Sequence, residues 1–122
     1  MTDARSFLPL SPQQFHILLA LADRPRHGYG VIRDIEERTA GAMRLGTGTL
    51  YTALARLDAL ALLQETRRRP AAKDDDERRR YYELTPLGRA VLKAETARLE
   101  TLVRHAHRKG IAGGGPAWSR GK

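Results

Sequence analysis

The spacing of apolar side chains changes twice along this chain of 122 residues, and this change constrains the fold more than any other feature. Leu50 and Leu54 belong to a stripe at helical spacing that typifies the first half of the chain. The segments 63–69 and 78–85 instead predict strands, the second by its two-residue alternation. From Pro86 the helical spacing returns. We therefore expect three helices, a two-stranded hairpin and a long final helix, an α+β fold that is mainly α.

Two helix starts carry clear capping signals. Ser11 can cap the first helix, Pro12 lies where a missing N–H costs nothing, and Gln14 completes a capping box. Thr85 and Pro86 repeat the cap-plus-proline pattern before the final helix. The first helix is apolar around much of its circumference, which predicts burial in a core or an interface.

Composition narrows the classes of function. The formal net charge of +8 indicates a polyanionic partner, either nucleic acid or an anionic membrane surface. The absence of cysteine excludes disulfides, thiolate zinc sites and cysteine nucleophiles. No apolar run has the length of a signal peptide core or a membrane span, so we expect a soluble cytoplasmic protein and no membrane partner.

The sequence contains no residue set typical of catalysis. Carboxylate pairs, nucleophile–base sets, phosphate loops and metal clusters are all missing at usable spacing. His105 and His107 lie two apart on the final helix and face different directions, so they make a poor metal pair. We expect no enzyme activity, no cofactor and no metal.

The predicted order of elements is that of a winged helix-turn-helix, whose third helix enters the major groove of DNA. The outward face of that helix is polar or small and carries no acidic group. It consists of Gly48, Thr49, Thr52, Ala55, Arg56 and Ala59, with Tyr51 on the flank. Arginine runs at 67–69 and 78–80 place six cations on the hairpin, where they would bind phosphates without sequence preference.

Three segments resemble the PadR family of bacterial transcription regulators. They are His-Gly-Tyr-Gly at 27–30, Gly-Thr-Leu-Tyr-Thr-Ala-Leu-Ala-Arg-Leu at 48–57, and Arg-Arg-Tyr-Tyr-Glu-Leu-Thr-Pro-Leu-Gly at 79–88. The chain departs from the family pattern at Thr52, where proline is usual, and at Ala61, where glycine is usual. It resembles the short class, for which the family implies a final helix that mediates dimerisation. A small-molecule effector is implied only by the family resemblance, and by no residue pattern in this sequence.

The residues expected at DNA follow from their chemistry and from the resemblance. Gly48 lets a phosphate approach the helix N-terminus, Arg56 can pair with guanine, and Tyr29 and Tyr51 resemble the family's backbone-contacting tyrosines. The full set is Tyr29, Thr47, Gly48, Thr49, Tyr51, Thr52, Arg56, Arg67, Arg68, Arg69, Arg78, Arg79 and Arg80. The set expected at a dimer interface is Leu18, Leu92, Leu99, Leu102, Val103 and Ala106.

Several of the residues and segments singled out above also have simpler structural interpretations. A solvated surface arginine is nearly as good an explanation of Arg56, and Tyr82 and Leu84 fit a core strand better than a site. The acidic run at 74–77 would be repelled by DNA, so the tip either bends away or screens the arginines. Trp118 lies in a glycine-rich tail and is given no ligand-binding role.

We expect residues 1–10 to form an arm, 11–85 a winged-helix DNA-binding domain, 86–109 a dimerisation helix and 110–122 a flexible tail. The predicted function is sequence-specific binding of double-stranded DNA by a homodimer on a pseudo-palindromic operator, to repress transcription. The alternatives are a winged-helix module that binds protein, or a non-specific binder of nucleic acid or anionic membrane.

Overall fold

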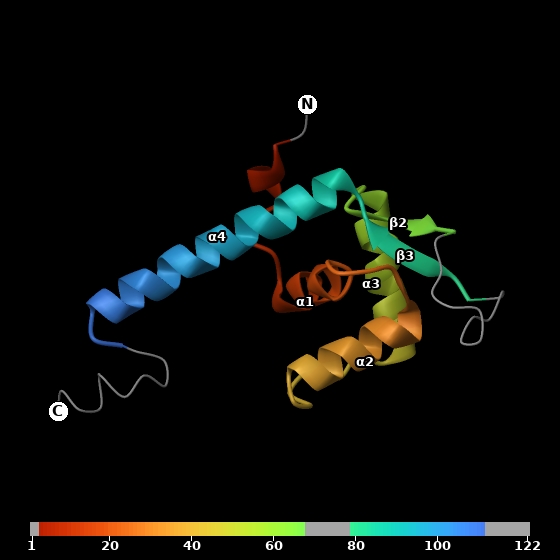
Figure 1. Ribbon diagram of the computed structural model, residues 1–122, viewed down its shortest axis with the longest axis horizontal. Helices are drawn as coiled ribbons and strands as arrows, with labels where there is room; N and C mark the ends of the chain where they lie inside the picture. Colours follow the sequence, from red (N-terminus) through yellow and green to blue (C-terminus); the bar gives the residue numbers. More distant parts are fainter. Residues whose placement is uncertain (1–2, 68–78, 112–122) are drawn as a thin grey trace.

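The fold is a small helical body with a three-stranded sheet at one end (Figure 1). The computed structural model describes residues 3–67 and 79–111. In chain order the elements are the 3-10 helix η1 (Ala4–Phe7), α1 (Pro12–Ala20), β1 (Arg26–His27), α2 (Gly28–Arg38), α3 (Thr47–Ala59), β2 (Leu63–Thr66), β3 (Tyr81–Leu84) and α4 (Pro86–Arg108). The predicted winged-helix order, mainly α, is confirmed.

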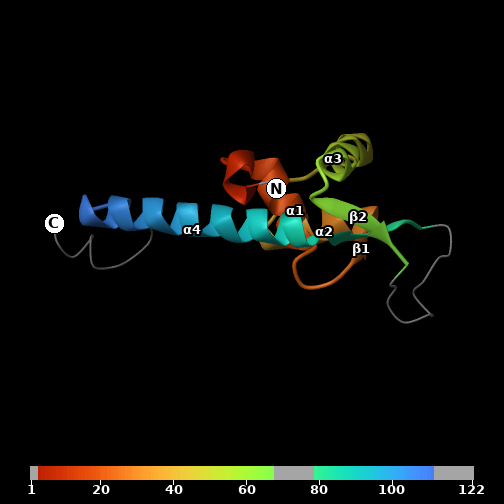
Figure 2. The same ribbon diagram turned by 90° about the horizontal axis from the view of Figure 1, so that it is seen from above.

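Helix α4 differs from the other helices in how far it extends. Helix α1 packs against α2 and α4, α2 packs against α3, and η1 packs against α4. The two views agree that the C-terminal half of α4 runs past η1 and α1, away from the sheet (Figures 1 and 2). The last buried residue of α4 is Glu95. Its remaining turns therefore present side chains that no described element of the chain buries.

Both predicted helix starts are confirmed. The Ser11 hydroxyl accepts from the Gln14 amide at 3.1 Å, and the Gln14 side chain accepts from the Ser11 amide at 3.0 Å. The Thr85 hydroxyl accepts from the Gly88 amide at 2.9 Å and donates to the Ala61 carbonyl at 2.6 Å. Thr85 thus caps α4 and also connects its start to the turn between α3 and β2.

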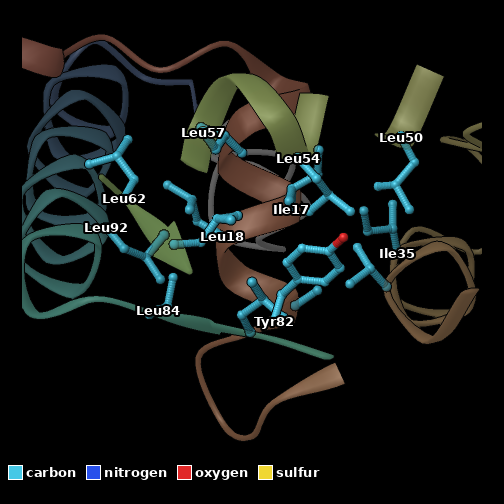
Figure 3. Close-up of a cluster of buried hydrophobic side chains, with 14 of the residues drawn as sticks. Ile17, Leu18, Ile35, Leu50, Leu54, Leu57, Leu62, Tyr82, Leu84 and Leu92 are labelled. Carbon is cyan, nitrogen blue, oxygen red and sulfur yellow. The ribbon is translucent and has the colours of Figure 1, made fainter. Parts of the chain in front are cut away.

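The core confirms the predicted stripe of α3 and corrects two interface predictions. Leu50, Leu54 and Leu57 are at most 1% exposed and pack with residues from α1 and β3 (Figure 3). Leu18 is fully buried among them, and Leu92 is 6% exposed. The prediction that Leu18 and Leu92 contact a partner chain was wrong, because both side chains are used inside the chain's own core.

The sheet has one strand more than predicted and shorter strands than predicted. Its order is β1-β3-β2, antiparallel throughout, with His27 of β1 opposite Tyr81. Tyr81 and Tyr82 alternate along β3, yet they are only 3% and 6% exposed. The His27 ring packs edge-on against Tyr81 with ring centroids 5.3 Å apart, so this face is covered as well.

The described part of the predicted N-terminal arm packs against the fold. The Leu10 amide donates to the Glu95 carboxylate at 3.0 Å, and Leu10 is 8% exposed. Glu95 also accepts from Arg98 at 2.6 and 2.9 Å. The Arg98 hydrogen bonds lower the pKa of Glu95 in spite of its burial. A charged Glu95 therefore connects the segment before α1 to the middle of α4.

The residue Ala61 offers a test of backbone strain. It has φ of +64°, in the left-handed region that favours glycine, where α3 turns into β2. This conformation costs an L-residue about 1–2 kcal/mol. Glycine avoids that strain, but its greater conformational entropy in the unfolded state cancels part of the gain in stability. We expect Ala61→Gly to raise the free energy of unfolding by about 0.5–1 kcal/mol in urea denaturation. Ala59→Gly, in the last turn of α3, should lower it by a similar amount, and equal losses in both variants would contradict this assignment.

Candidate nucleic-acid interface

The start of α3 is open to a ligand. Gly46 is the N-cap residue and makes no side-chain capping hydrogen bond, and Thr47, Gly48 and Thr49 are exposed in the first turn. A β carbon built at Gly48 would have no neighbour within 4 Å, so the surface there is unobstructed. Free amides at a helix N-terminus suit an anion such as phosphate.

A groove lies between the N-terminal turn of α1 and the exposed face of α3. Its volume is about 670 Å³. It is lined by Ser11, Gln13, Gln14, Gly48, Thr49, Thr52, Ala53, Arg56 and Leu57. Four predicted residues, Gly48, Thr49, Thr52 and Arg56, thus share one surface with polar groups of α1. No local signal in the sequence marks Gln13 for this surface, because packing of the two helices brings it there.

A second cavity brings β1, α2, α3 and the hairpin together. It has a volume of about 380 Å³ and is lined by His27, Tyr29, Tyr51, Arg79 and Arg80. Four of these were predicted from the sequence, and His27 was not. Tyr29 is 56% and Tyr51 46% exposed, so part of each side chain is accessible to a ligand. Phenol and guanidinium donors that converge on one cavity are suited to binding an oxyanion.

His27 contacts both the start of α2 and the hairpin. Its Nδ1 accepts from the Gly30 amide at 3.1 Å, which caps α2, and its Nε2 lies 3.0 Å from the Arg79 guanidinium. Partial burial lowers the pKa of His27, and the charges of Arg79 and Arg33 lower it further. A neutral imidazole has one acceptor nitrogen, so the ring accepts from only one of the two donors at a time.

The hairpin supplies cations beside this cavity. Arg67, Arg79 and Arg80 are exposed, and Arg80 forms an exposed ion pair with Glu65 at 3.9 Å. Burial raises the pKa of Tyr82 on the strand that follows, and the Glu65 charge raises it further, so this hydroxyl stays protonated. The predicted Arg68, Arg69 and Arg78, the acidic run at 74–77, and Trp118 lie outside the described residues.

The predicted interface residues of α4 that remain form one face. Leu99, Leu102, Val103 and Ala106 are spaced i, i+3, i+4 and i+7. Leu102 is 48% and Val103 52% exposed, whereas Leu99 and Ala106 are half-buried. A helix that presents an apolar stripe of this kind typically packs against another helix.

Within residues 3–67 and 79–111, no three His, Cys, Asp or Glu side chains are grouped so that they could hold a metal ion. Over the same ranges, no helix is both long enough and apolar enough to cross a membrane.

Comparison with known proteins agrees with this geometry. Residues 17–94 match the model of the PadR-like transcriptional regulator family, which is more than half of the chain. The chain belongs to this family. The uncharacterized 37.1 kDa protein in transposon TN4556 of Streptomyces fradiae is 42% identical over 89 residues. That match takes in 73% of this chain but only 23% of the Streptomyces protein.

Solved structures of PadR regulators share the fold. A PadR family transcription regulator from Clostridium difficile R20291 has a TM-score of 0.62 and 23% identity, and the match covers 78% of this chain and 94% of that one. Bacillus subtilis PadR in complex with operator DNA has a TM-score of 0.57 and 17% identity, over 70% of this chain and 47% of that one. At these identities the likeness shows the fold alone.

Proposed function

We propose that this PadR-like protein binds double-stranded DNA sequence-specifically as a homodimer and represses transcription from a pseudo-palindromic operator. The observation that carries the proposal is the exposed face of α3, where Thr52 and Arg56 border one groove and Tyr51 borders a second, basic cavity. The operator complex of Bacillus subtilis PadR supports a DNA ligand for this fold.

Each part of this surface has a task suited to its chemistry. Arg56 and Thr52, exposed on α3, would contact base edges in the major groove, and Arg56 would favour guanine through its two parallel donors. The open N-terminal turn of α3 would bind one backbone phosphate. Tyr29, Tyr51 and the hairpin arginines would bind others, which contribute affinity without sequence preference.

The apolar stripe of α4 supplies the dimer. Pairing Leu99, Leu102, Val103 and Ala106 with the same face of a second copy would remove them from water. A two-fold dimer presents two α3 helices to successive turns of the major groove, about 34–36 Å apart, which fits a pseudo-palindrome. A small-molecule effector, implied by the family, would act by favouring one spacing of these helices.

The direct test is selection of duplexes from a random pool, followed by titration at several salt concentrations. We expect the selected duplex to bind about a thousandfold more tightly than a scrambled duplex at physiological salt. Equal binding to both that vanishes as salt rises would leave only a non-specific, charge-driven binder. Binding of neither duplex would point to the protein-binding alternative.

The double variant Tyr51→Ala, Arg56→Ala tests the assigned surface. Both side chains are exposed, so the fold should persist while a phosphate contact and a base contact are lost. We expect affinity for the selected duplex to fall by about a hundredfold or more, with the dimer unchanged in sedimentation. Lys93→Ala, which removes an exposed charge on α4, is the control and should bind nearly as wild type. Normal binding by the double variant would show that α3 is wrongly assigned.

A further inference from the structure

The glycine at position 28 is explained by a neighbouring side chain and not by its own backbone. Gly28 is the first residue of α2 and is buried. Among the described residues the positive-φ glycines are Gly41 and Gly110, so the conformation of Gly28 is open to any residue. Glycine in a helix is less stable than alanine by about 0.5–1 kcal/mol, so its presence needs another reason.

The reason is the position of Tyr51. A β carbon built at Gly28 would lie 2.6 Å from Cζ of Tyr51 and closer still to the hydroxyl oxygen. Carbon atoms do not approach so closely without displacement. The Tyr51 ring, which comes from α3, can therefore rest against the start of α2 only while residue 28 has no side chain.

The contact with Gly28, called the seat of Tyr51 below, places Tyr51 in a cavity that is also lined by arginine side chains. Tyr51 lines the cavity of about 380 Å³ together with Tyr29 of α2 and with Arg79 and Arg80 of the hairpin. The residue before Gly28 is His27, whose ring contacts Arg79. Gly28 and His27, which are consecutive in the chain, thus contact Tyr51 of α3 and Arg79 of the hairpin, and both of these side chains line the cavity.

We propose that Gly28 is a positioning residue of the DNA site: it seats the Tyr51 hydroxyl beside the hairpin arginines, so that these groups bind one backbone phosphate together. The inference rests on the proposed function. Gly28 itself contacts no DNA and acts through Tyr51.

The test compares Gly28→Ala with Gly30→Ala in the full-length protein. A β carbon at Gly30 would meet Arg26 Cβ at 3.6 Å and His27 Cε1 at 3.7 Å, which is ordinary contact. We expect Gly28→Ala to weaken binding of the selected duplex by about tenfold to a hundredfold, the effect of losing a hydrogen bond to a charged group. Gly30→Ala should change binding by less than about twofold.

Two comparisons distinguish positioning of a phosphate contact through Tyr51 from base recognition and from an effect that does not act through Tyr51. Phosphate contacts are independent of base sequence, so Gly28→Ala should weaken binding of the scrambled duplex by the same factor, whereas Arg56→Ala should affect the selected duplex more. In a Tyr51→Ala background the space is empty, and adding Gly28→Ala should cause no further loss. A full additional loss in that background would overturn the proposal.

A measurement without DNA tests the seat itself. In NMR spectra of protein with isotope-labelled tyrosine rings, Gly28→Ala should change the chemical shifts of the Tyr51 ring strongly, and Gly30→Ala should not. Unchanged Tyr51 signals in Gly28→Ala would overturn the inference even if DNA binds as proposed. Failure of the wild-type protein to bind any duplex would overturn the proposed function and the phosphate role together, while shifted signals would still support the seat.

Discussion

Replacing Gly88 by alanine is expected to lower the free energy of unfolding by about 3 kcal/mol, because the added methyl group meets backbone. A β carbon at Gly88 would lie 2.8 Å from the carbonyl carbon of Leu62, 3.2 Å from its Cα and closer still to its oxygen. The same Leu62 carbonyl accepts from the Thr85 amide at 3.2 Å. Neither side can rotate away, so α4 must separate from the turn between α3 and β2.

The sign of this effect distinguishes it from helix propensity. A glycine-to-alanine change inside a helix normally stabilises it by about 1 kcal/mol. Gly30→Ala in α2, whose β carbon has space, should leave the urea midpoint unchanged or raise it. Gly88→Ala should lower the midpoint clearly when unfolding is followed by circular dichroism. A midpoint at or above that of wild type would show that α4 does not pack on Leu62 as closely as described.

The parts of the fold that depend on local chemistry were predictable from the sequence. Ser11 and Thr85 start helices through hydrogen bonds to amides three residues on, and these pairings need no distant partner. Leu50, Leu54 and Leu57 form a core stripe because their spacing matches the turn of a helix. Ala61, singled out for the missing glycine, has the positive φ that glycine would favour.

The parts that depend on packing between distant segments were not predictable. Strand β1 has only two residues, too few for an alternating pattern, and it exists because β3 offers a free edge. Leu18 lies on a helix that is apolar on several sides, and the sequence does not show which side faces the chain's own core.

The candidate site shows the same division. The family resemblance led to Tyr51 and the charge of the arginine run led to Arg79, but neither led to the cavity that α2, α3 and the hairpin form around them. His27 carries no charge-based signal of its own, and its contact with Arg79 spans 52 positions in the sequence.

The double variant Leu102→Glu, Val103→Glu is expected to convert the dimer that we propose into a folded monomer. These side chains are 48% and 52% exposed within the chain, so glutamates there face water in the monomer and leave its core intact. In a paired stripe they would be buried without cationic partners, which costs several kcal/mol. We expect the dimer dissociation constant in sedimentation equilibrium to rise by at least about a hundredfold.

DNA binding should fall with the dimer, because a monomer loses the gain of about a hundredfold or more that comes from linking two half-sites. The matched control is Ala90→Glu, Ala97→Glu, which adds the same two charges at exposed positions on the opposite face of α4. This control should remain dimeric and bind the selected duplex with only a modest loss. A dimer that survives glutamates at Leu102 and Val103 would place the interface elsewhere, and the apolar stripe would then need a different partner.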